Sequence, residues 1–460
     1  MYKINFNEPI HIHFIGIGGI SMSGFAELLH TAGFKISGSD SKKSKITEHL
    51  EAIGITILYG QRASNITKDI DLVVYTAAIH DENPEMQAVI EQNIPRMDRA
   101  EMIGQVMQNY NKAIAISGTH GKTTTTSMVS HIFLEADLDP TISVGGILNA
   151  IEGNIRIGKS ENFITEACEY TNSFLKFFPR YSIILNIEED HLDFFKDIND
   201  IRNSFRSFAK RLPVDGVLFI NGEIENYQEI TADLPCKVIT YGVNGSDYNY
   251  CATNITFNEF GYGEYDLVKD GTFVDHINLH VVGIHNVSNS LPAIALGLEM
   301  NIPLEIIKKG LIAFQGTQRR FEYKGTIGGI TIIDDYAHHP TEIEATLQAA
   351  KRYPHEDIWC VFQPHTYTRT KAFLKEFANV LTLADKIVLT DIYAAREVNT
   401  GEISSKDLLR ELEYLGKEVY YFQGFDEIEN FLLQNCTHGD LLITMGAGDV
   451  VTIGEALLGN

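Results

Sequence analysis

The sequence predicts an α/β protein made of several doubly wound units. Short apolar runs alternate with helix-spaced or polar segments along most of the chain, and glycine-rich loops follow two of these runs. Strands that alternate with helices form a parallel sheet. At 460 residues the chain is also too long for one ordinary hydrophobic core, so we expect two to four domains.

The first predicted domain is residues 1–110. It opens with an apolar run, His11 to Ile17, that ends in glycines, and Ser21 to Ala32 then has helical spacing. Three more short apolar runs read as strands: Phe34–Ser37, Thr56–Leu58 and Leu72–Tyr75.

The second predicted domain is residues 111–318. Ala113 to Ser117 has the composition of a buried strand and leads into a second glycine loop and a helix. The remaining expected strands are Phe163–Glu166, Ser182–Asn186 and Gly216–Asn221, and the expected helices are Asn286–Met300 and Pro303–Ala313.

The third predicted domain is residues 319–460. It alternates regularly, with strands at Thr331–Asp334, Ile358–Phe362, Lys386–Thr390 and Leu441–Met445, and helices at Thr341–Tyr353 and Thr370–Leu383. Three α/β units in series are therefore expected.

Composition narrows the class of protein. A net charge of −24 disfavours general binding to nucleic acid, although a local pocket of cations and backbone N–H groups can still bind a small anion. The five scattered cysteines include no C-x-x-C pair, which fits a reducing compartment. No apolar run approaches the roughly 20 residues that span a bilayer, and the start lacks a signal-peptide pattern. We expect a cytoplasmic protein without membrane insertion.

The second glycine loop has the features of a phosphate-binding loop. It joins a predicted strand to a predicted helix, so backbone N–H groups would point at phosphate oxygens. Lys122 would lie on the β- and γ-phosphates, and the Thr123 hydroxyl would bind Mg²⁺. The loop is a shortened pattern, because Ile116 stands where the first glycine is usual. The competing interpretation is a glycine turn with an exposed lysine. For the phosphate loop too we expect Lys122 to be an exposed loop residue with little core contact, so that its loss would hardly affect folding. The residues expected to bind ATP here are Gly118, Thr119, His120, Gly121, Lys122, Thr123 and Thr124.

The first glycine loop is a weaker signal. Gly16, Gly18 and Gly19 follow a strand, but Ser21 stands where a dinucleotide fingerprint needs glycine. Asp40 lies about twenty residues on, where such folds place a ribose-binding acid. A tight structural turn explains the loop as well, and a nucleotide-linked substrate suits it better than a redox cofactor.

Several polar clusters follow predicted strands. Glu166 ends one strand and Asp190-His191 follows another, so together they could hold Mg²⁺, or they could be a surface acid patch beside a structural histidine. His285-Asn286 and Asn289 could bind adenine or cap a helix. Arg319-Arg320 lies at the second boundary. Two further clusters end strands of the third domain: Asp334 to Pro340 and Gln363 to Arg369.

In this order the motifs resemble those of the Mur ligases of peptidoglycan synthesis. The resemblance covers nearly the whole chain and is carried by three groups of residues. They are the loops at Gly16 and Gly118, then Asn186-Ile187-Glu188 with Asp190-His191 and His285-Asn286, and then Arg319-Arg320-Phe321-Glu322, Asp334-Asp335-Tyr336 with His338-His339-Pro340, and Phe362-Gln363-Pro364-His365.

The resemblance implies three domains: a Rossmann-like domain that binds the UDP substrate, a central ATPase domain and a C-terminal Rossmann-like domain. It is nearest to the ligases that add L-alanine to the lactyl carboxylate of UDP-N-acetylmuramate through an acyl phosphate. It implies that Lys122, Glu166, His191 and Arg320 are catalytic, with Thr123, Glu166 and His191 holding two Mg²⁺ ions. Asn286, Arg320 and Asp335 would bind ATP. The substrates would contact Gly16, Gly18, Gly19, Ser39, Asp40, Tyr336, His338, His365 and Arg369.

The sequence departs from the family pattern at three places. Cys168 replaces an acid that follows Glu166, Thr366 replaces an arginine after His365, and Arg206 stands about where several relatives have a modified lysine. Three rivals remain: a ligase that adds another residue or a murein tripeptide, a regulatory nucleotide-binding protein without catalysis, and an NAD-dependent oxidoreductase. The oligomeric state is open between monomer and homodimer.

Overall fold

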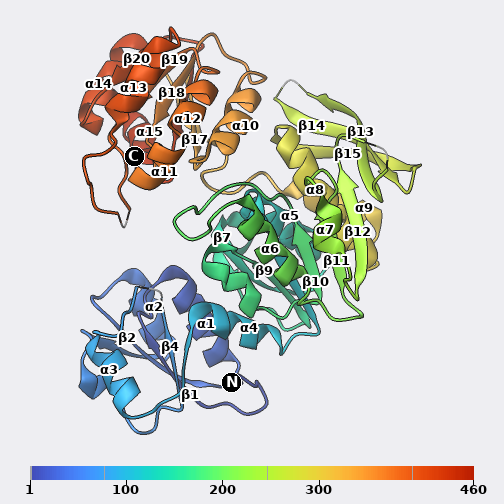
Figure 1. Cartoon of the computed structure of the whole chain (residues 1–460), viewed down its shortest axis with the longest axis vertical. Coiled ribbons are helices and arrows are strands. Elements are labelled where there is room, and N and C mark those ends of the chain that lie inside the picture. The colour runs from blue at the N-terminus through green and yellow to red at the C-terminus, as the bar shows by residue number, and fades with distance from the viewer. Residues whose placement is uncertain (1–2, 77, 246, 259, 396, 460) are drawn as a thin grey trace. The chain divides into compact units, whose positions relative to one another are not determined.

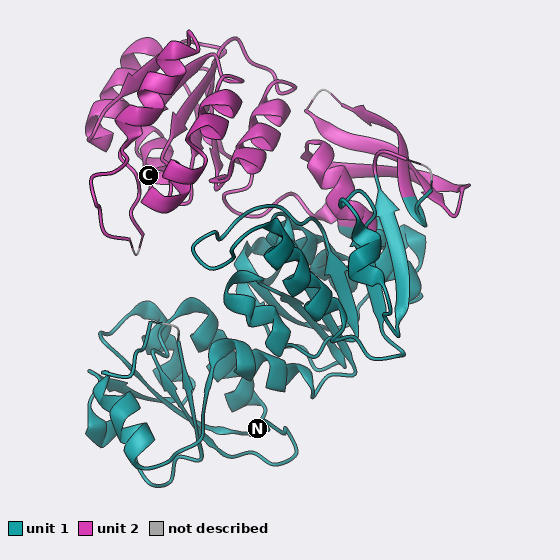
Figure 2. Cartoon of the chain, in the orientation of Figure 1, with its two compact units in different colours: residues 1–242, 247–250, 292–310 teal, residues 243–246, 251–291, 311–460 magenta. Residues whose placement is uncertain are grey.

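The computed structural model describes residues 3–459 except 77, 246, 259 and 396. The chain divides into two compact units, one made of residues 1–242, 247–250 and 292–310, and the other of residues 243–246, 251–291 and 311–460 (Figure 2). The boundaries of the three expected domains stay a prediction, because compactness alone groups the first expected domain with most of the second.

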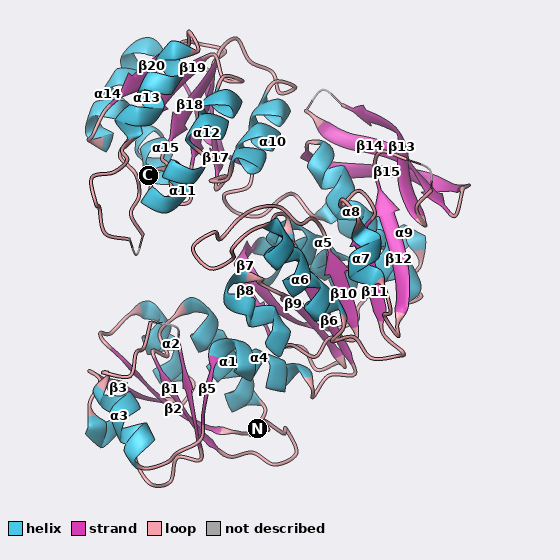
Figure 3. Cartoon of the chain, viewed as in Figure 1, coloured by secondary structure: helices cyan, strands magenta, loops and turns pink. Residues whose placement is uncertain are grey.

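Unit 1 begins with a parallel five-stranded sheet of order β3-β2-β1-β4-β5 (Figure 1). Four α-helices belong to the same segment of the chain, and the α/β alternation confirms the expected fold class (Figure 3). The bounds are β1 His11–Ile15, α1 Ile20–Thr31, β2 Lys35–Asp40, α2 Lys45–Ala52, β3 Thr56–Tyr59, β4 Leu72–Tyr75, α3 Pro84–Glu91, β5 Arg96–Asp98 and α4 Arg99–Met107.

Three of these helices begin at capped residues. Ser44 and Asp98 each accept the amide of the residue three positions on and complete capping boxes, and Asn83 accepts two first-turn amides just before Pro84. Caps of this kind satisfy N–H groups that have no partner inside the helix. They explain why α2, α3 and α4 start where they do.

A second sheet of unit 1 carries the phosphate loop. The strands of this sheet that belong to unit 1 follow the order β12-β11-β10-β6-β9-β7-β8, in which β6 has the parallel neighbours β10 and β9. The bounds are β6 Lys112–Ser117, α5 Lys122–Glu135, β7 Thr141–Leu148, β8 Gly153–Arg156, β9 Asn162–Glu166, β10 Tyr181–Ile184, α6 Ile198–Ala209, β11 Val217–Asn221, α7 Tyr227–Thr231 and β12 Lys237–Gly242.

One hydrophobic core joins the two sheets of unit 1. It runs from Ile4 to Ile230 in sequence and contains buried residues of both. Phe163 of β9 lies between two aromatic rings from the N-terminal segment, with ring centroids 6.4 Å from Phe25 and 5.1 Å from Tyr110. This shared core is the reason that the two segments form one unit.

Unit 2 contains most of an antiparallel hairpin region and a six-stranded C-terminal sheet of order β16-β17-β21-β18-β19-β20. The hairpin strands are β13 Tyr250–Phe257, β14 Tyr262–Lys269 and β15 Thr272–Val282, and the helices α8 Ile284–Glu299 and α9 Leu304–Ala313 follow them. The C-terminal sheet is parallel except for β16 at its edge.

The C-terminal sheet contains the four expected strands, but the edge strands Glu322–Ile327 and Glu418–Tyr421 and the helices Ser405–Tyr414, Phe425–Asn435 and Val451–Leu457 were not expected. The expected helix Thr370–Leu383 is two helices that break at Phe373. The bounds are β16 Glu322–Ile327, β17 Ile330–Asp335, α10 Pro340–Ala350, β18 Ile358–Phe362, α11 Tyr367–Ala372, α12 Leu374–Leu381, β19 Lys386–Leu389, α13 Ser405–Tyr414, β20 Glu418–Tyr421, α14 Phe425–Asn435, β21 Leu441–Met445 and α15 Val451–Leu457. Across the described part of the chain, no helix combines the length and apolarity needed to cross a membrane.

Candidate active site

The loop between β6 and α5 is built to expose backbone N–H groups. Gly118 has φ 145° and Gly121 has φ 82°, conformations that favour glycine. Gly121 is the N-cap of α5 and has no side chain to accept the first-turn amides. Those amides, at the positive end of a 14-residue helix, fit the oxygens of a phosphate chain.

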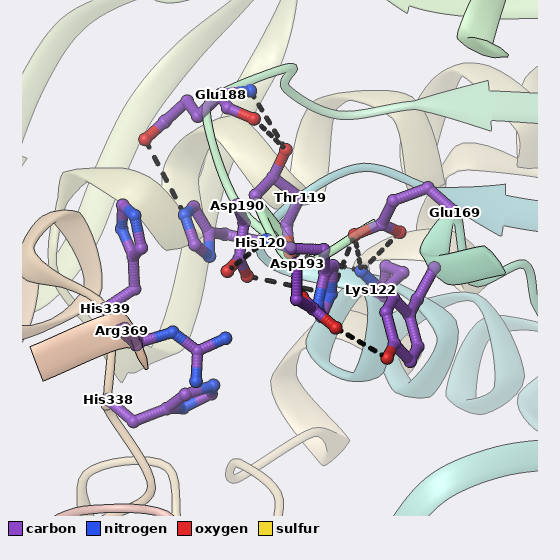
Figure 4. Close-up of polar contacts among 12 residues, drawn as sticks. Thr119, His120, Lys122, Glu169, Glu188, Asp190, Asp193, His338, His339 and Arg369 are labelled. Atoms are coloured by element: carbon purple, nitrogen blue, oxygen red, sulfur yellow. Dashed lines mark hydrogen bonds and ion pairs between the residues drawn. The ribbon is translucent and has the colours of Figure 1, made fainter. Parts of the chain in front are cut away.

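Lys122 is buried in an ion pair. Its Nζ lies 2.9 and 3.3 Å from the two carboxylate oxygens of Glu169 (Figure 4). It also donates to the carbonyls of Gly118 at 2.5 Å and Thr119 at 3.1 Å. The Lys122 side chain is 16% exposed and that of Glu169 only 3%. The expectation of an exposed lysine with little core contact is therefore wrong, because the loop folds back over its own side chain.

Electrostatics keep this lysine charged. Burial lowers the pKa of Lys122 and is the largest single effect, but the charge and hydrogen bond of Glu169 together with neighbouring groups outweigh it, and the pKa is raised. Glu166 adds to the same effect. A charged ammonium group in the first turn of a helix is suited to bind an anion.

The segment after β10 holds the loop in place. The Asn186 side chain accepts from the His120 amide at 2.7 Å and donates to the His120 carbonyl at 3.0 Å. The Thr119 hydroxyl accepts the Glu188 amide at 2.9 Å (Figure 4). Two residues of the loop are thus fixed by a segment 66 or more positions away.

The residues expected to hold Mg²⁺ lie around this loop. The Glu166 carboxylate ends β9 and accepts the Gly145 amide of β7 at 2.5 Å. A Cβ at the next residue, Gly146, would lie 3.3 Å from the Thr123 methyl group. Thr123 and Glu166 therefore both adjoin one short stretch of β7, and their oxygen atoms are ligands that Mg²⁺ prefers.

His191 reaches the same carboxylate as Lys122. Its Nε2 lies 3.7 Å from a Glu169 oxygen and 3.7 Å from Asp190, and its ring packs on Tyr170 with centroids 4.5 Å apart. Glu169, for which the sequence motif suggested no role, thus lies between the lysine and the histidine. Cys168, at the departure from the family pattern, is an exposed free thiol.

The first glycine loop is a tight turn closed by the end of β2. The amides of Gly16 and Ile17 donate to the Ser39 carbonyl, and the Gly18 amide donates to the Asp40 carboxylate at 2.8 Å. The buried Ser39 hydroxyl donates to Glu85. Ser39 and Asp40 therefore shape the loop, and their contact with a substrate stays a prediction.

In unit 2, the two arginines at the start of the C-terminal segment have different surroundings. Arg319 makes bonds to Asp334 at 2.9 Å and to the carbonyls of Gly446 and Gly448. Arg320 lies 3.5 Å from Glu342 and over the Tyr336 ring. Arg319 is thus tied into the sheet, whereas Arg320 pairs with Glu342 of α10.

Asp335 and Asn286, both expected to bind ATP, have backbone partners. Asp335 accepts amides of Phe321 and Ala337, and burial raises the pKa of its carboxyl to about 6 although Arg320 works against this. The Asn286 amide donates to the Val282 carbonyl and accepts from Asn289. Their part in nucleotide binding stays a prediction.

The histidine pair before α10 has divided roles. The His339 side chain accepts the Thr341 amide and caps the helix. His338 donates from Nδ1 to the Tyr336 carbonyl at 3.0 Å, and its ring meets that of His365 at 5.5 Å. Burial lowers the pKa of His338 to about 4, Glu342 raises it and Arg369 lowers it further.

His365 and Arg369 form a pair one turn apart. Arg369 donates to His365 Nδ1 at 3.2 Å. Since arginine has no acceptor, the histidine nitrogen must accept. The structure thus brings His338, His365 and Arg369 together in unit 2, as the sequence motifs suggested.

Comparison with known proteins decides the family. Three family models match in sequence order: the Mur ligase family catalytic domain over residues 11–111, the Mur ligase middle domain over 116–297, and the Mur ligase glutamate ligase domain over 319–448. The chain belongs to the Mur ligase family. Its fold is the three-domain α/β architecture of that family.

Similar Mur ligases match over their whole length. A UDP-N-acetylmuramate–L-alanine ligase of Lachnoclostridium phytofermentans is 64% identical, and one of Agathobacter rectalis 61% identical, with 100% of each chain covered. A solved UDP-N-acetylmuramate–alanine ligase of Thermotoga maritima is 30% identical with a TM-score of 0.80, covering 98% of both chains. A murein peptide ligase of Psychrobacter arcticus, at 23% identity and a TM-score of 0.70, shares the fold.

Proposed function

We propose that this Mur ligase joins L-alanine to the lactyl carboxylate of UDP-N-acetylmuramate. The products are UDP-N-acetylmuramoyl-L-alanine, ADP and phosphate, a step of peptidoglycan synthesis. The observation that carries the proposal is the full-length similarity, at 64% identity, to a relative that bears this name. The phosphate loop with its buried Lys122–Glu169 pair supports ATP as the energy source.

The chemistry follows from the weakness of a carboxylate as an electrophile. The lactyl carboxylate oxygen attacks the γ-phosphorus of ATP, and the bond to the bridging oxygen of ADP breaks. The amine of alanine then attacks the acyl carbon of the resulting acyl phosphate. The bond from this carbon to the phosphate oxygen breaks, phosphate leaves with the electron pair, and the nitrogen releases a proton as the amide forms. Lys122 and the first-turn amides of α5 would stabilise the charge that develops on the phosphoryl oxygens.

The acidic residues beside the loop support divalent-metal binding. When bound, Mg²⁺ would supply charge neutralisation on the phosphates. Thr123 and Glu166 would hold one ion, and His191 a second. Arg320, Asn286 and Asp335 would bind ATP, and Tyr336, His338, His365 and Arg369 would contact alanine.

The test is ATP-dependent phosphate release with UDP-N-acetylmuramate against a panel of single amino acids. We expect release with L-alanine, weaker release with glycine or serine by roughly ten- to a few hundredfold, and none with bulky amino acids. Release that needs no amino acid, or that follows an acidic one, would contradict the proposal.

A further inference from the structure

The segment after β19 lies against the residues that carry the amino-acid site. Tyr393 forms a parallel bridge with His365, its amide donates to the Pro364 carbonyl at 2.8 Å, and its carbonyl accepts the Thr366 amide at 2.9 Å. The Tyr393 ring also stacks on His365, with centroids 5.8 Å and planes 16° apart. Tyr393 therefore supports the start of α11 from one side.

The Glu397 carboxylate also binds the start of α11. It accepts the amides of Tyr367 at 2.6 Å and Thr368 at 3.0 Å, and also the Thr368 hydroxyl. The local N-cap, Thr366, reaches only the Arg369 amide, at 3.4 Å. The free N–H groups of the first turn of α11 are thus satisfied by a residue about thirty positions downstream.

The turn that Glu397 holds is strained. Thr366 has φ 65° and ψ 145°, a region that a β-branched residue rarely adopts. Such a conformation persists only where its surroundings hold it. Here the Thr366 amide is bound by Tyr393, its carbonyl accepts from Thr370, and the next two amides are bound by Glu397.

We propose that Glu397 is a positioning residue for the amino-acid substrate. It holds the strained turn at Thr366, so that His365 before the turn and Arg369 after it keep one orientation toward the substrate carboxylate. The Arg369–His365 bond at 3.2 Å transmits any shift of the turn to both side chains. The inference rests on the proposed function, since it concerns the same alanine site.

The first experiment compares substrate constants of purified full-length variants. For Glu397→Ala we expect the KM for L-alanine to rise about tenfold or more. Glu397→Gln keeps an acceptor oxygen, so the logarithm of its KM should rise by about half as much. The KM values for ATP and UDP-N-acetylmuramate should stay within about twofold. Glu402→Gln is the matched control, because Glu402 pairs with Lys371 of the same helix at 2.6 Å with both side chains mostly exposed, and it should change none of the three.

The second experiment tests the strain. Amide hydrogen exchange at Tyr367 and Thr368 should accelerate in Glu397→Ala and stay at the wild-type rate in Glu402→Gln. In a Thr366→Gly background, where positive φ is unstrained, the Glu397→Ala change should raise the KM for alanine less than in the wild-type background.

An unchanged KM for alanine in Glu397→Ala, with active protein, would overturn the inference, as would an equal rise for all three substrates or an equal rise in both Thr366 backgrounds. Wild-type protein that does not ligate alanine would instead overturn the proposed function. The two failures are therefore distinguishable.

Discussion

At the scale of single residues, the Lys122–Glu169 ion pair links the catalytic role of the phosphate loop to the stability of the fold. Glu169 is almost fully buried, so removing its cation leaves an uncompensated charge. We expect Lys122→Ala to lower turnover about a hundredfold or more and to reduce the free energy of unfolding by about 3–5 kcal/mol. Steady-state assays and urea titration measure the two effects.

The double variant Lys122→Ala with Glu169→Gln separates catalysis from folding. Neutralising the buried carboxylate should restore most of the lost stability and none of the turnover. If the double variant is as unstable as the single one, the stability effect of Lys122 does not arise from Glu169.

His338 makes the stability of the folded protein depend on pH. Burial, partly offset by Glu342, holds its pKa at about 4 in the folded protein against an ordinary value of 6.5. Between these values the unfolded chain binds a proton that the native protein does not, so stability falls as pH falls from 6.5 to 4, by at most about 1.4 kcal/mol per pH unit. Asp335 has the opposite sign, because its pKa is raised to about 6.

His338→Asn keeps a donor for the Tyr336 carbonyl and removes the titration. Unfolding measured from pH 7 to 4 should show a shallower loss of stability in the variant than in the wild type. Asp335 is present in both proteins, so its contribution cancels in the comparison. Parallel curves would show that His338 does not carry this part of the acid sensitivity.

At the scale of elements, the phosphate loop depends on the segment after β10. Asn186→Ala removes both bonds to the His120 backbone, which should weaken ATP binding about tenfold, since each lost bond contributes about 0.5–1.5 kcal/mol. The KM for ATP measures this effect.

Asn221 offers a matched control for Asn186. It is a buried asparagine at the end of β11, and its side chain donates to the Leu185 carbonyl at 3.0 Å and accepts the Glu223 amide at 3.0 Å, rather than bonding to His120. Asn221→Ala should lower the melting temperature and leave the KM for ATP near the wild-type value. Equal changes in KM for both variants would contradict a specific role of Asn186.

The sequence located elements where apolar periodicity was strong and missed those where it was weak. The strands at Leu72–Tyr75, Ile358–Phe362 and Leu441–Met445 have their expected bounds, because buried parallel strands are continuous apolar runs. The helices α2 and α4 were missed, although their N-caps Ser44 and Asp98 were readable signals.

The site was predictable only in part, because only some of its residues belong to a local sequence pattern. Lys122 and Thr123 follow from a local loop pattern, which needs no knowledge of the fold. The burial of Lys122 and the place of Glu169 depend on β9 lying beside β6, and no local signal encodes that pairing. The same holds for Glu397, which contacts α11 from about thirty residues away.

At the scale of the whole molecule, part of the stabilisation by bound nucleotide should depend on Mg²⁺ and on the residues that hold it. A non-hydrolysable ATP analogue with Mg²⁺ should raise the melting temperature of the wild type, because a ligand that binds only the native state stabilises it. In Glu166→Gln the Mg²⁺-dependent part of the shift should be lost, and chelation should remove it from the wild type reversibly.

Glu161 is the control for this measurement. It pairs with Lys112 at 2.7 Å and directly precedes β9, whereas Glu166 ends the strand. Glu161→Gln should keep the full Mg²⁺-dependent shift. An intact shift in Glu166→Gln would contradict the metal assignment.

The central claim is the identity of the amino acid that this Mur ligase adds, and a competition tests it most directly. UDP-N-acetylmuramate and ATP with Mg²⁺ are supplied together with equal concentrations of L-alanine, D-glutamate and an L-Ala-D-Glu-diamino-acid tripeptide, and the products are identified by mass. The account predicts UDP-N-acetylmuramoyl-L-alanine as the dominant product, formed in step with phosphate release. A dominant product that carries D-glutamate or the tripeptide would contradict it.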